Sequence, residues 1–403
     1  MRQRSLLALL VAVTALTPAA LHMLVPSLPL LANIFNASTA SVQLVLTLFL
    51  AGIAAGQLVY GPLSDSLGRR PVLIAGLLLF LGGTVLCGLA WSLPALIFGR
   101  VLEACGGCAG IVLGRAIIRD IFDRDRAAGA IATITMAMSL APSISPAIGA
   151  YLSQWIGWRA NFLVLGALGA AVLIITQMRL EETGLARESA DPVGMTRSFV
   201  VLLRSREFLA FGLATAFTSA SWFTFLASAP YLLSAVLHEP PSTYGLMILL
   251  PMAAYVLGNA GVTRLSISLG SARLFFSGLV LSLVSGAMLA VWCVVGLTPW
   301  ALFVPMALSS VGNGLSQPPG IAAGLSVYPR IAGAASGMIG FLQMIVAALG
   351  TLLVGELPQD TPLPMVAVVG VCMALALVFG LLAVRMPARG GTIFGYRVRR
   401  EAR

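Results

Sequence analysis

Lysine is absent from this sequence, and charge of either sign is scarce. All 24 basic residues are arginine, and charged residues make up 9% of the 403 positions, against 59% for hydrophobic residues. Soluble globular proteins devote about a quarter of their residues to charge, because a water-facing surface needs it. The scarcity of charge therefore excludes an ordinary soluble protein and predicts that lipid surrounds most of the chain.

Residues that carry metal or covalent chemistry are also few. The only two histidines, His22 and His238, fall in different segments, so the clustered side chains that a membrane-embedded enzyme needs are missing. Cys105 and Cys108 form a CxxC pair, but small residues flank them, which favours close helix packing over a metal or redox site. The sequence shows no nucleotide-binding P-loop pattern and no sizeable polar domain of the kind that a receptor or scaffold would carry. We therefore predict neither an enzyme nor a receptor, and no metal or cofactor.

Long apolar runs divide the chain into twelve segments. Each can cross the ~30 Å hydrocarbon core, which takes about 20 residues as a helix. The runs are apolar on every face rather than alternately, which excludes transmembrane β-strands and predicts an all-α membrane protein. The first segment could be a signal peptide, but it continues past Pro18 and Pro26 without a clear cleavage site, so we expect a retained span. The predicted spans are 6–31, 40–60, 71–90, 94–117, 127–152, 160–179, 208–233, 244–263, 273–296, 300–325, 331–355 and 364–384.

The arginines indicate how the spans are oriented. All 24 except Arg100 and Arg159 fall on connections, tails or helix ends that would share one side of the membrane. Because arginine accumulates on the cytosolic side, both termini are predicted to be cytosolic. A basic excess can also indicate nucleic-acid binding, but that requires a patch on a soluble surface, so no nucleic-acid partner is predicted.

The longest polar stretch, 180–207, separates six predicted spans from six others, as a fused repeat would. Part of it, Ser198–Leu203, is expected to form a short amphipathic helix on the membrane surface. The predicted domains are a six-helix bundle at 1–180, a cytosolic linker at 181–207, a second six-helix bundle at 208–386 and a basic cytosolic tail at 387–403.

The predicted loop after the second span reads Gly61-Pro-Leu-Ser-Asp65-Ser-Leu-Gly68-Arg69-Arg70-Pro71. It resembles the signature loop of the major facilitator superfamily, although Ser66 replaces the arginine that usually follows the aspartate. The resemblance implies a cytosolic gate, in which Asp65 accepts hydrogen bonds from a neighbouring helix end and Arg69 pairs with a carboxylate across the gate. The alternative is a tight turn with basic membrane anchors.

Two charged residues lie deep inside the fourth span, Arg100 and Glu103, three residues apart and hence on one helix face, whereas Arg115 lies at its end. A charge at bilayer depth costs about 3 kcal/mol or more, which makes the pair a candidate functional site. The surrounding motif, with Gly-Arg-Ala-Ile-Ile-Arg-Asp at 114–120, is similar to that of Bcr/CflA-type drug:proton antiporters. The resemblance implies that Glu103 carries the transported proton and that Arg100 assists. The alternative is a structural pair that locks the bundle.

The fifth span carries Pro142, Pro146 and Gly149, and this segment resembles the superfamily's antiporter motif, with Ser145 and Ala150 in place of glycines. Two prolines four residues apart bend a helix, and such a bend can seal a proton path; the alternative is a packing kink.

In the first span, His22 occupies a position where Bcr/CflA-type proteins have an aspartate. An imidazole titrates near neutrality, so His22 is either a proton or substrate contact or a packing residue.

The second half has no charged residue in the interior of a predicted span, which suits an uncharged or amphipathic solute. The family fold would place spans 1, 4, 7 and 10 around the substrate cavity and spans 3, 6, 9 and 12 outside. Helix packing is the alternative role for most of the aromatic residues. The polar and aromatic candidates of this half include Tyr231, Asn259 and Gln317. The candidate cavity residues are Phe217, Ser221, Trp222, Phe225, Met252, Tyr255, Asn313 and Gln343.

Together these resemblances imply a monomeric, proton-coupled drug exporter in the bacterial cytoplasmic (inner) membrane, working by alternating access. Its partners would be a small-molecule substrate, protons and membrane lipid. The alternatives are a major-facilitator transporter of a metabolite such as a sugar, an amino acid or a nucleoside-like compound, and a non-transport polytopic membrane protein.

Overall fold

The computed structural model describes residues 3–121, 124–183, 192–358 and 360–385, and in these ranges every regular element is helical. The predicted basic tail at 387–403 lies outside the described residues, as do positions 184–191 of the predicted linker. The chain divides into two compact units. Unit 1 comprises Met1–Pro192, Leu226–Leu249 and Thr351–Thr361, and unit 2 comprises Val193–Phe225, Leu250–Gly350 and Pro362–Arg403.

The predicted spans correspond to twelve long helical segments within the described residues. Ten of them are long and apolar enough to cross a membrane, and α6 and α13 complete the set. The first half contains α1 (Gln3–Met23), η1 (Val25–Ser27), α2 (Leu28–Ile34), α3 (Thr39–Leu67), α4 (Arg69–Gly88), α5 (Leu93–Ile121), α6 (Arg124–Trp155) and α7 (Arg159–Arg179). The second half contains α8 (Pro192–Arg204), α9 (Arg206–Tyr231), η2 (Leu232–Val236), α10 (Pro241–Met247), α11 (Leu249–Leu269), α12 (Ser271–Val295), α13 (Pro299–Ser326), η3 (Pro329–Ile331), α14 (Ala332–Glu356) and α15 (Leu363–Arg385).

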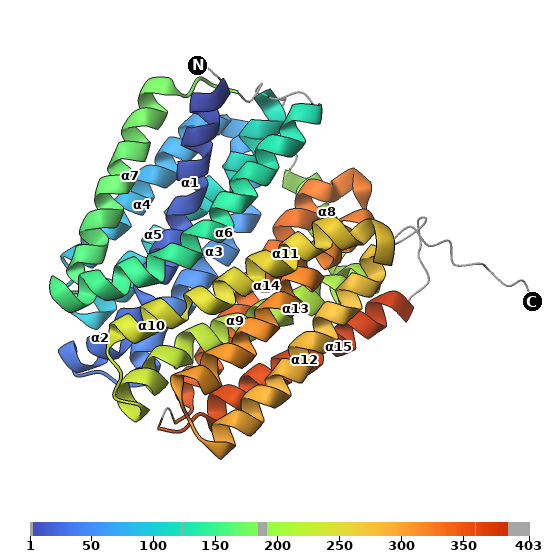
Figure 1. Ribbon diagram of the computed structural model, residues 1–403. Coiled ribbons are helices and arrows are strands. Elements are labelled where there is room, and N and C mark those ends of the chain that lie inside the picture. Colours follow the sequence, from blue (N-terminus) through green and yellow to red (C-terminus); the bar gives the residue numbers. More distant parts are fainter. Residues whose placement is uncertain (1–2, 122–123, 184–191, 359, 386–403) are drawn as a thin grey trace, which may run out of the picture. The chain divides into compact units, whose positions relative to one another are not determined.

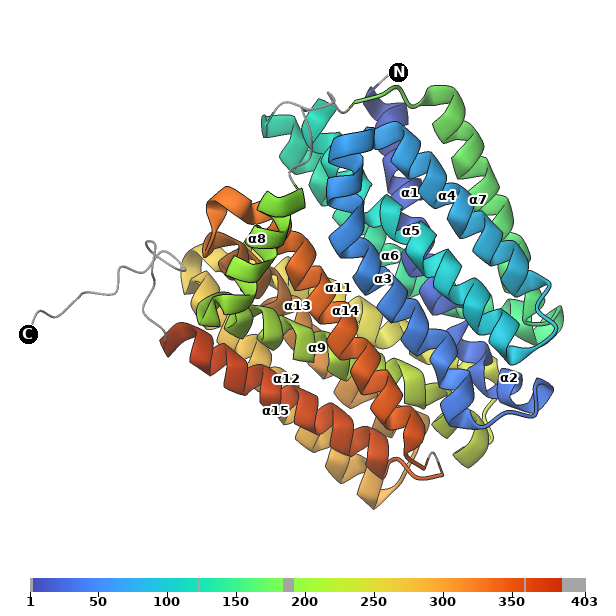
Figure 2. The same ribbon diagram turned by 180° about the vertical axis from the view of Figure 1, so that it is seen from behind.

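Long helices run side by side within each unit (Figure 1). In unit 1, α5 packs against α1, α3 and α4, and α7 covers α4; Figure 2 shows the same neighbours from behind. In unit 2, α12 packs between α13 and α15. The ends of α9 and α14 belong to unit 1, where Thr351 Oγ1 lies 2.8 Å from Thr47 Oγ1 and Gln43 Nε2 donates to the Ala227 carbonyl over 3.4 Å.

The prediction of a loop at 61–71 is wrong. Helix α3 continues to Leu67 and α4 begins at Arg69, so Gly68 alone interrupts the helices. Gly68 has φ of +94°, a backbone region that only glycine enters without steric cost. Gly270, with φ of +81°, joins α11 to α12 in the same way. This shared geometry supports the predicted internal repeat.

Glycines bring helix backbones into contact at matching places in the two units. A Cβ on Gly83 of α4 would lie 2.6 Å from the Gly99 carbonyl of α5. A Cβ on Gly278 of α12 would lie 2.4 Å from the Gly312 carbonyl of α13. Small residues at such positions let membrane helices pack closely without a hydrophobic driving force from water. The same close packing accounts for Cys108, which is buried and free against Gly56 of α3.

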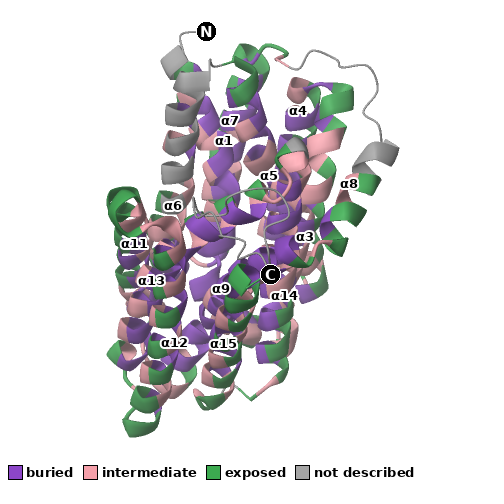
Figure 3. Cartoon of the chain, turned by 90° about the vertical axis from the view of Figure 1, so that its right-hand side faces the viewer, coloured by how far each residue is buried: buried purple, intermediate pink, exposed green. Residues whose placement is uncertain are grey.

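Large apolar side chains are exposed on the outer faces of both units, whereas buried residues lie where helices meet (Figure 3). The exposed ones occur on α4, α7, α12 and α15, which are spans 3, 6, 9 and 12, and also on α6 and α11. A soluble surface would avoid so much apolar area, but lipid accepts it. Examples are Leu78, Val85, Leu163, Ile174, Val284, Val291, Val371 and Val378.

Candidate functional site

A charge cluster is buried in the interior of unit 1. Arg100 and Glu103 of α5 are 1% and 0% exposed, and Arg100 Nη1 donates to Glu103 Oε2 over 2.5 Å. The other carboxylate oxygen, Oε1, accepts a hydrogen bond of 2.9 Å from Thr84 Oγ1 on α4. The structure therefore confirms the predicted pairing on one helix face and adds Thr84, which the sequence had not indicated.

The guanidinium of Arg100 also contacts two further helices. Its Nη1 donates to the Ala20 carbonyl of α1 over 3.2 Å, and its Cζ lies 3.8 Å from the centroid of the Phe49 ring of α3. The carbonyl and the ring face both favour the positive charge. The cluster thus joins α1, α3, α4 and α5, so a change in the charge of Glu103 would alter contacts on four helices.

Close backbone packing determines where Glu103 lies. A Cβ on Gly83 would come within 2.4 Å of the Glu103 backbone nitrogen. Because α4 and α5 approach so closely, Thr84, the next residue on α4, reaches the carboxylate directly. The two buried charges compensate each other, whereas either one alone would destabilise the fold by about 3–5 kcal/mol.

His22 lies on α1, two residues from Ala20, and is 5% exposed. Its Nδ1 is 2.9 Å from the Pro18 carbonyl. A carbonyl only accepts, so Nδ1 carries the hydrogen in this contact. His22 is thus close along α1 to Ala20, which contacts Arg100. Its own hydrogen-bond partner is a backbone carbonyl of the same helix.

The gate motif forms an ion-pair cluster at one end of unit 1. Arg69 Nη1 lies 2.6 Å from Asp65 Oδ1, and Arg69 Nε lies 3.0 Å from Oδ2 of Asp120, at the end of α5. Ser64 Oγ accepts a further hydrogen bond of 2.5 Å from the same guanidinium. The carboxylates that pair with Arg69 thus belong to its own unit, whereas the sequence suggested a partner across the gate. Asp120 is the last residue of the 114–120 motif, and this motif was the sequence signal that could have identified it as a partner of Arg69.

Glu182, just after α7, caps the first turn of α4. Its carboxylate accepts from the backbone N–H groups of Arg69, over 2.8 Å, and Arg70, over 3.2 Å. Arg70 in turn donates to the Gln177 carbonyl over 2.9 Å. A carboxylate at a helix N-terminus satisfies free N–H groups and the helix dipole. A Cβ on Gly68 would lie 2.6 Å from Glu182 Oε2, whereas one on Gly61 would meet nothing within 4 Å. Of the two motif glycines, only Gly68 is required by the geometry.

The antiporter-like motif packs against α1 and α10 inside unit 1. A Cβ on Gly149 would overlap the Met23 carbonyl at 1.9 Å, so α6 and the end of α1 are in backbone contact. A Cβ on Gly245 of α10 would lie 3.0 Å from Ala147 Cα and 3.4 Å from the carbonyl oxygen of Pro146, which is buried. Pro142 is half-buried on the same helix.

Most of the candidate cavity residues in unit 2 have packing partners. Ser221 and Phe225 are 0% exposed, and Phe225 packs edge-to-face on Phe303 with the ring centroids 5.2 Å apart. Phe217 stacks on Phe379, with the ring centroids 5.6 Å apart.

The candidates from α11 and α13 in unit 2 are also largely enclosed. Asn313 Oδ1 accepts a hydrogen bond of 3.2 Å from Ser282 Oγ, and Met252 is buried. Trp222, Tyr255 and Gln343 are half-buried.

Gln343 belongs to a polar network in unit 2 that joins three helices. Its Nε2 donates to Gln317 Oε1 of α13 over 2.9 Å. Gln317 Nε2 donates to Ser219 Oγ of α9 over 3.0 Å and lies 3.4 Å from the Thr215 carbonyl. The structure thus adds Ser219 and Thr215 to the polar residues that the sequence singled out.

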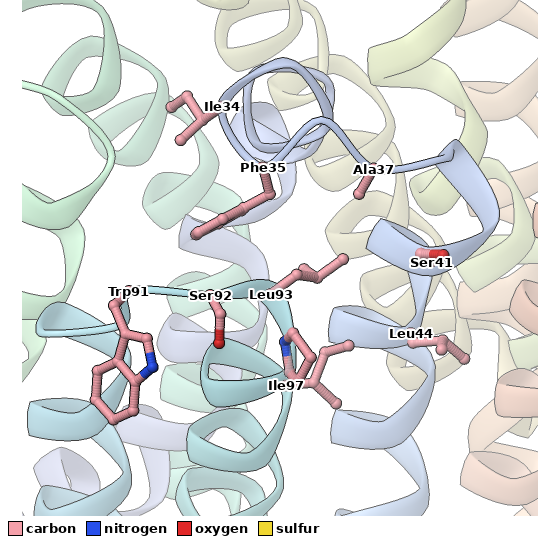
Figure 4. A pocket seen from close by; sticks show the side chains of 10 residues that line it. Ile34, Phe35, Ala37, Ser41, Leu44, Trp91, Ser92, Leu93 and Ile97 are labelled. Carbon is pink, nitrogen blue, oxygen red and sulfur yellow. The ribbon is translucent and has the colours of Figure 1, made fainter.

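Two cavities occur elsewhere on the units. One of about 620 Å³ opens in unit 1 at the ends of α2, α3 and α5, where Figure 4 shows Trp91 and Ser92 on one side, Ser41 on the other and Phe35 between them. Another of about 530 Å³ lies in unit 2 between α8 and the α13–α14 connection. Neither is lined by a residue that the sequence assigned to substrate binding. The first is lined by Ile34, Phe35, Ala37, Ser41, Leu44, Trp91, Ser92, Leu93, Pro94 and Ile97.

Comparisons with known proteins identify the family. The sequence model of the Major Facilitator Superfamily matches residues 10–351. Multidrug resistance protein D of Escherichia coli strain K12 is 29% identical over 89% of this chain and 91% of its own length. Bicyclomycin resistance protein homolog of Haemophilus influenzae is 26% identical over 90% of this chain and 92% of its own length. Chloramphenicol resistance protein of Pseudomonas aeruginosa is 29% identical over 90% of this chain and 86% of its own length.

Solved structures show the same fold. A bacterial homolog of the human lysosomal transporter Spinster, in an inward-facing and unoccupied conformation, superimposes with a TM-score of 0.76 at 18% identity, over 96% of this chain and 98% of that one. A D-xylose–proton symporter gives a TM-score of 0.78 at 11% identity, over 96% and 99%. The resemblance seen in the gate and span-four motifs is therefore confirmed. The chain belongs to the Major Facilitator Superfamily and is a multi-pass membrane transporter, not an enzyme.

Proposed function

We propose that this protein exports small amphipathic drugs, or related compounds, across the bacterial cytoplasmic (inner) membrane in exchange for protons. It acts as a monomer by alternating access, with both termini in the cytosol. The relatives named for bicyclomycin, chloramphenicol and multidrug resistance support this cargo class. The concentration of arginines on the connections and helix ends that share one predicted side of the membrane supports the orientation.

The observation that carries the proposal is the buried pair of Arg100 and Glu103. Within the described helical segments no other Asp or Glu lies so far from a helix end and is fully buried. When ionised, Glu103 compensates Arg100 and accepts from Thr84. When it takes up a proton, the guanidinium loses its counter-charge and keeps only the Ala20 carbonyl and the Phe49 ring.

Loss of the counter-charge makes the buried arrangement unfavourable. Leaving one member of a buried ion pair uncompensated costs about 3–5 kcal/mol, which is relieved when water reaches the charge. A proton on Glu103 therefore shifts the equilibrium toward a conformation in which Arg100 is hydrated. A bias of this size is sufficient to change the dominant state of a two-state carrier. The membrane potential adds about 2.3 kcal/mol for each charge moved across 100 mV.

Transport in proteoliposomes tests the proposal. The wild type should move drug against its gradient when a pH gradient is imposed and stop when an uncoupler collapses that gradient. Glu103→Gln, which keeps the shape but cannot ionise, should abolish pH-driven transport while leaving expression and drug binding intact, and Arg100→Ala should be as severe. Glu181→Gln, on an exposed carboxylate, is the matched control and should transport normally.

Undiminished pH-driven transport by Glu103→Gln would refute the role of Glu103. A susceptibility profile of an efflux-deficient host, with and without overexpression and with and without an uncoupler, identifies the cargo. A profile that no drug changes would refute drug export itself.

A further inference from the structure

In the polar network of unit 2, formed by Thr215, Ser219, Gln317 and Gln343, each hydrogen bond has a defined donor and acceptor. The Thr215 carbonyl can only accept hydrogen bonds, and it lies 3.1 Å from Ser219 Oγ and 3.4 Å from Gln317 Nε2. Ser219 therefore donates to Thr215, and its oxygen is left to accept from Gln317. The amide of Gln317 must then turn its nitrogen toward α9 and its oxygen toward α14.

The orientation of the Gln317 amide also determines the orientation of the Gln343 amide. Since Gln317 presents Oε1 to α14, Gln343 must present Nε2 to Gln317, as the 2.9 Å contact shows. Gln343 Oε1 is the end of the network, and no donor to it occurs among the described residues. The amide is half-buried, whereas Ser219 and Thr215 at the other end are 9% and 2% exposed. A half-buried carbonyl oxygen without a protein donor can accept from a ligand that supplies one.

The charges of unit 2 restrict what that ligand can be. Glu207, at the start of α9, is its one acidic residue in the described part of the chain, and the basic residues stand near helix ends. A cationic or anionic cargo would find no counter-charge at the depth of the network, and burying an unpaired charge is costly. Trp222, one turn after Ser219 on α9 and half-buried, offers an apolar ring on the same helix face.

We infer that Gln343 Oε1 is a cargo-recognition acceptor that selects uncharged solutes carrying an N–H or O–H donor. Gln317 and Ser219 are positioning residues that fix its nitrogen on Gln317 and so leave its oxygen for a ligand. The inference rests on the proposed export function and narrows its substrate class from amphipathic compounds in general to neutral hydrogen-bond donors.

A matched pair of probes tests the inference on the purified full-length protein. An uncharged aromatic diketopiperazine has two amide N–H groups, and its N,N′-dimethyl derivative has none, while the ring keeps both amides cis. The wild type should bind the N–H probe up to about tenfold more tightly, because one net hydrogen bond is worth roughly that factor at most. Calorimetry in detergent measures the ratio, and since it compares two ligands of one protein, the test does not depend on any variant folding.

Variants then assign the preference to the network. Gln343→Ala should bind both probes alike, and Gln317→Leu should reduce the preference because it releases Gln343 to rotate. Leu349→Ala, on the exposed face of the same helix, is the control and should keep the wild-type ratio. Equal binding of the two probes by the wild type, binding of neither, or an unchanged preference in Gln343→Ala would overturn the inference. A bound N–H probe that no pH gradient moves would instead refute the proposed export while supporting the acceptor.

Discussion

Replacing both members of the Arg100–Glu103 pair with apolar residues should restore the stability that a single replacement removes, while transport stays abolished. Glu103→Leu leaves a guanidinium that is 1% exposed without its counter-charge. That loss is worth about 3–5 kcal/mol, and the remaining contact with the Phe49 ring, worth about 2 kcal/mol when desolvated, does not offset it. Thr84 still donates to the Phe80 carbonyl over 2.9 Å, so it adds little to the loss.

The double variant Arg100→Met with Glu103→Leu removes both charges and fills the space with apolar atoms. Such replacements of buried ion pairs are neutral or stabilising by about 1–4 kcal/mol. Thermal unfolding in detergent should therefore give the double variant a melting temperature at or above that of the wild type. The single variants Glu103→Leu and Arg100→Met should unfold several degrees lower. Coupled transport in liposomes should be lost in all three. A double variant as unstable as the singles would refute the energetic reasoning, and one that still couples transport to protons would refute the functional role.

Two further predictions use glycines with matched controls. Gly68→Ala should greatly reduce transport, because φ of +94° is strained for alanine and its Cβ would meet Glu182, whereas Gly61→Ala should behave like the wild type; uptake into proteoliposomes compares them. Gly149→Ala should lower the amount of folded protein recovered by size-exclusion chromatography, because its Cβ would overlap a backbone carbonyl of α1. Gly82→Ala, where a Cβ meets nothing within 4 Å, should not, and equal recovery of the two would contradict the close packing of α1 and α6.

The sequence by itself determined the number of long membrane-crossing segments, most of their limits and the residues that carry charge into the membrane. Apolar runs of about 20 residues can only be spans, and their ends are marked by arginine, proline and glycine. The one clear error, a loop at 61–71, arose because Pro62 and the polar residues around Asp65 are turn formers in water. At the end of a long membrane helix, the helical hydrogen bonds of α3 persist to Leu67, and only Gly68 needs another conformation.

The partners of those residues were decided by tertiary structure alone. Nothing in the order of residues joins Thr84 and Phe49 to Arg100, or Glu182 to the first turn of α4, because these contacts cross between helices and depend on glycines that allow backbones to touch. In the same way, aromatic residues that suited a cavity, such as Phe217 and Phe225, pack on other rings. A hydrophobic pattern specifies that a face is buried, but which side chain it meets follows only from how the helices dock.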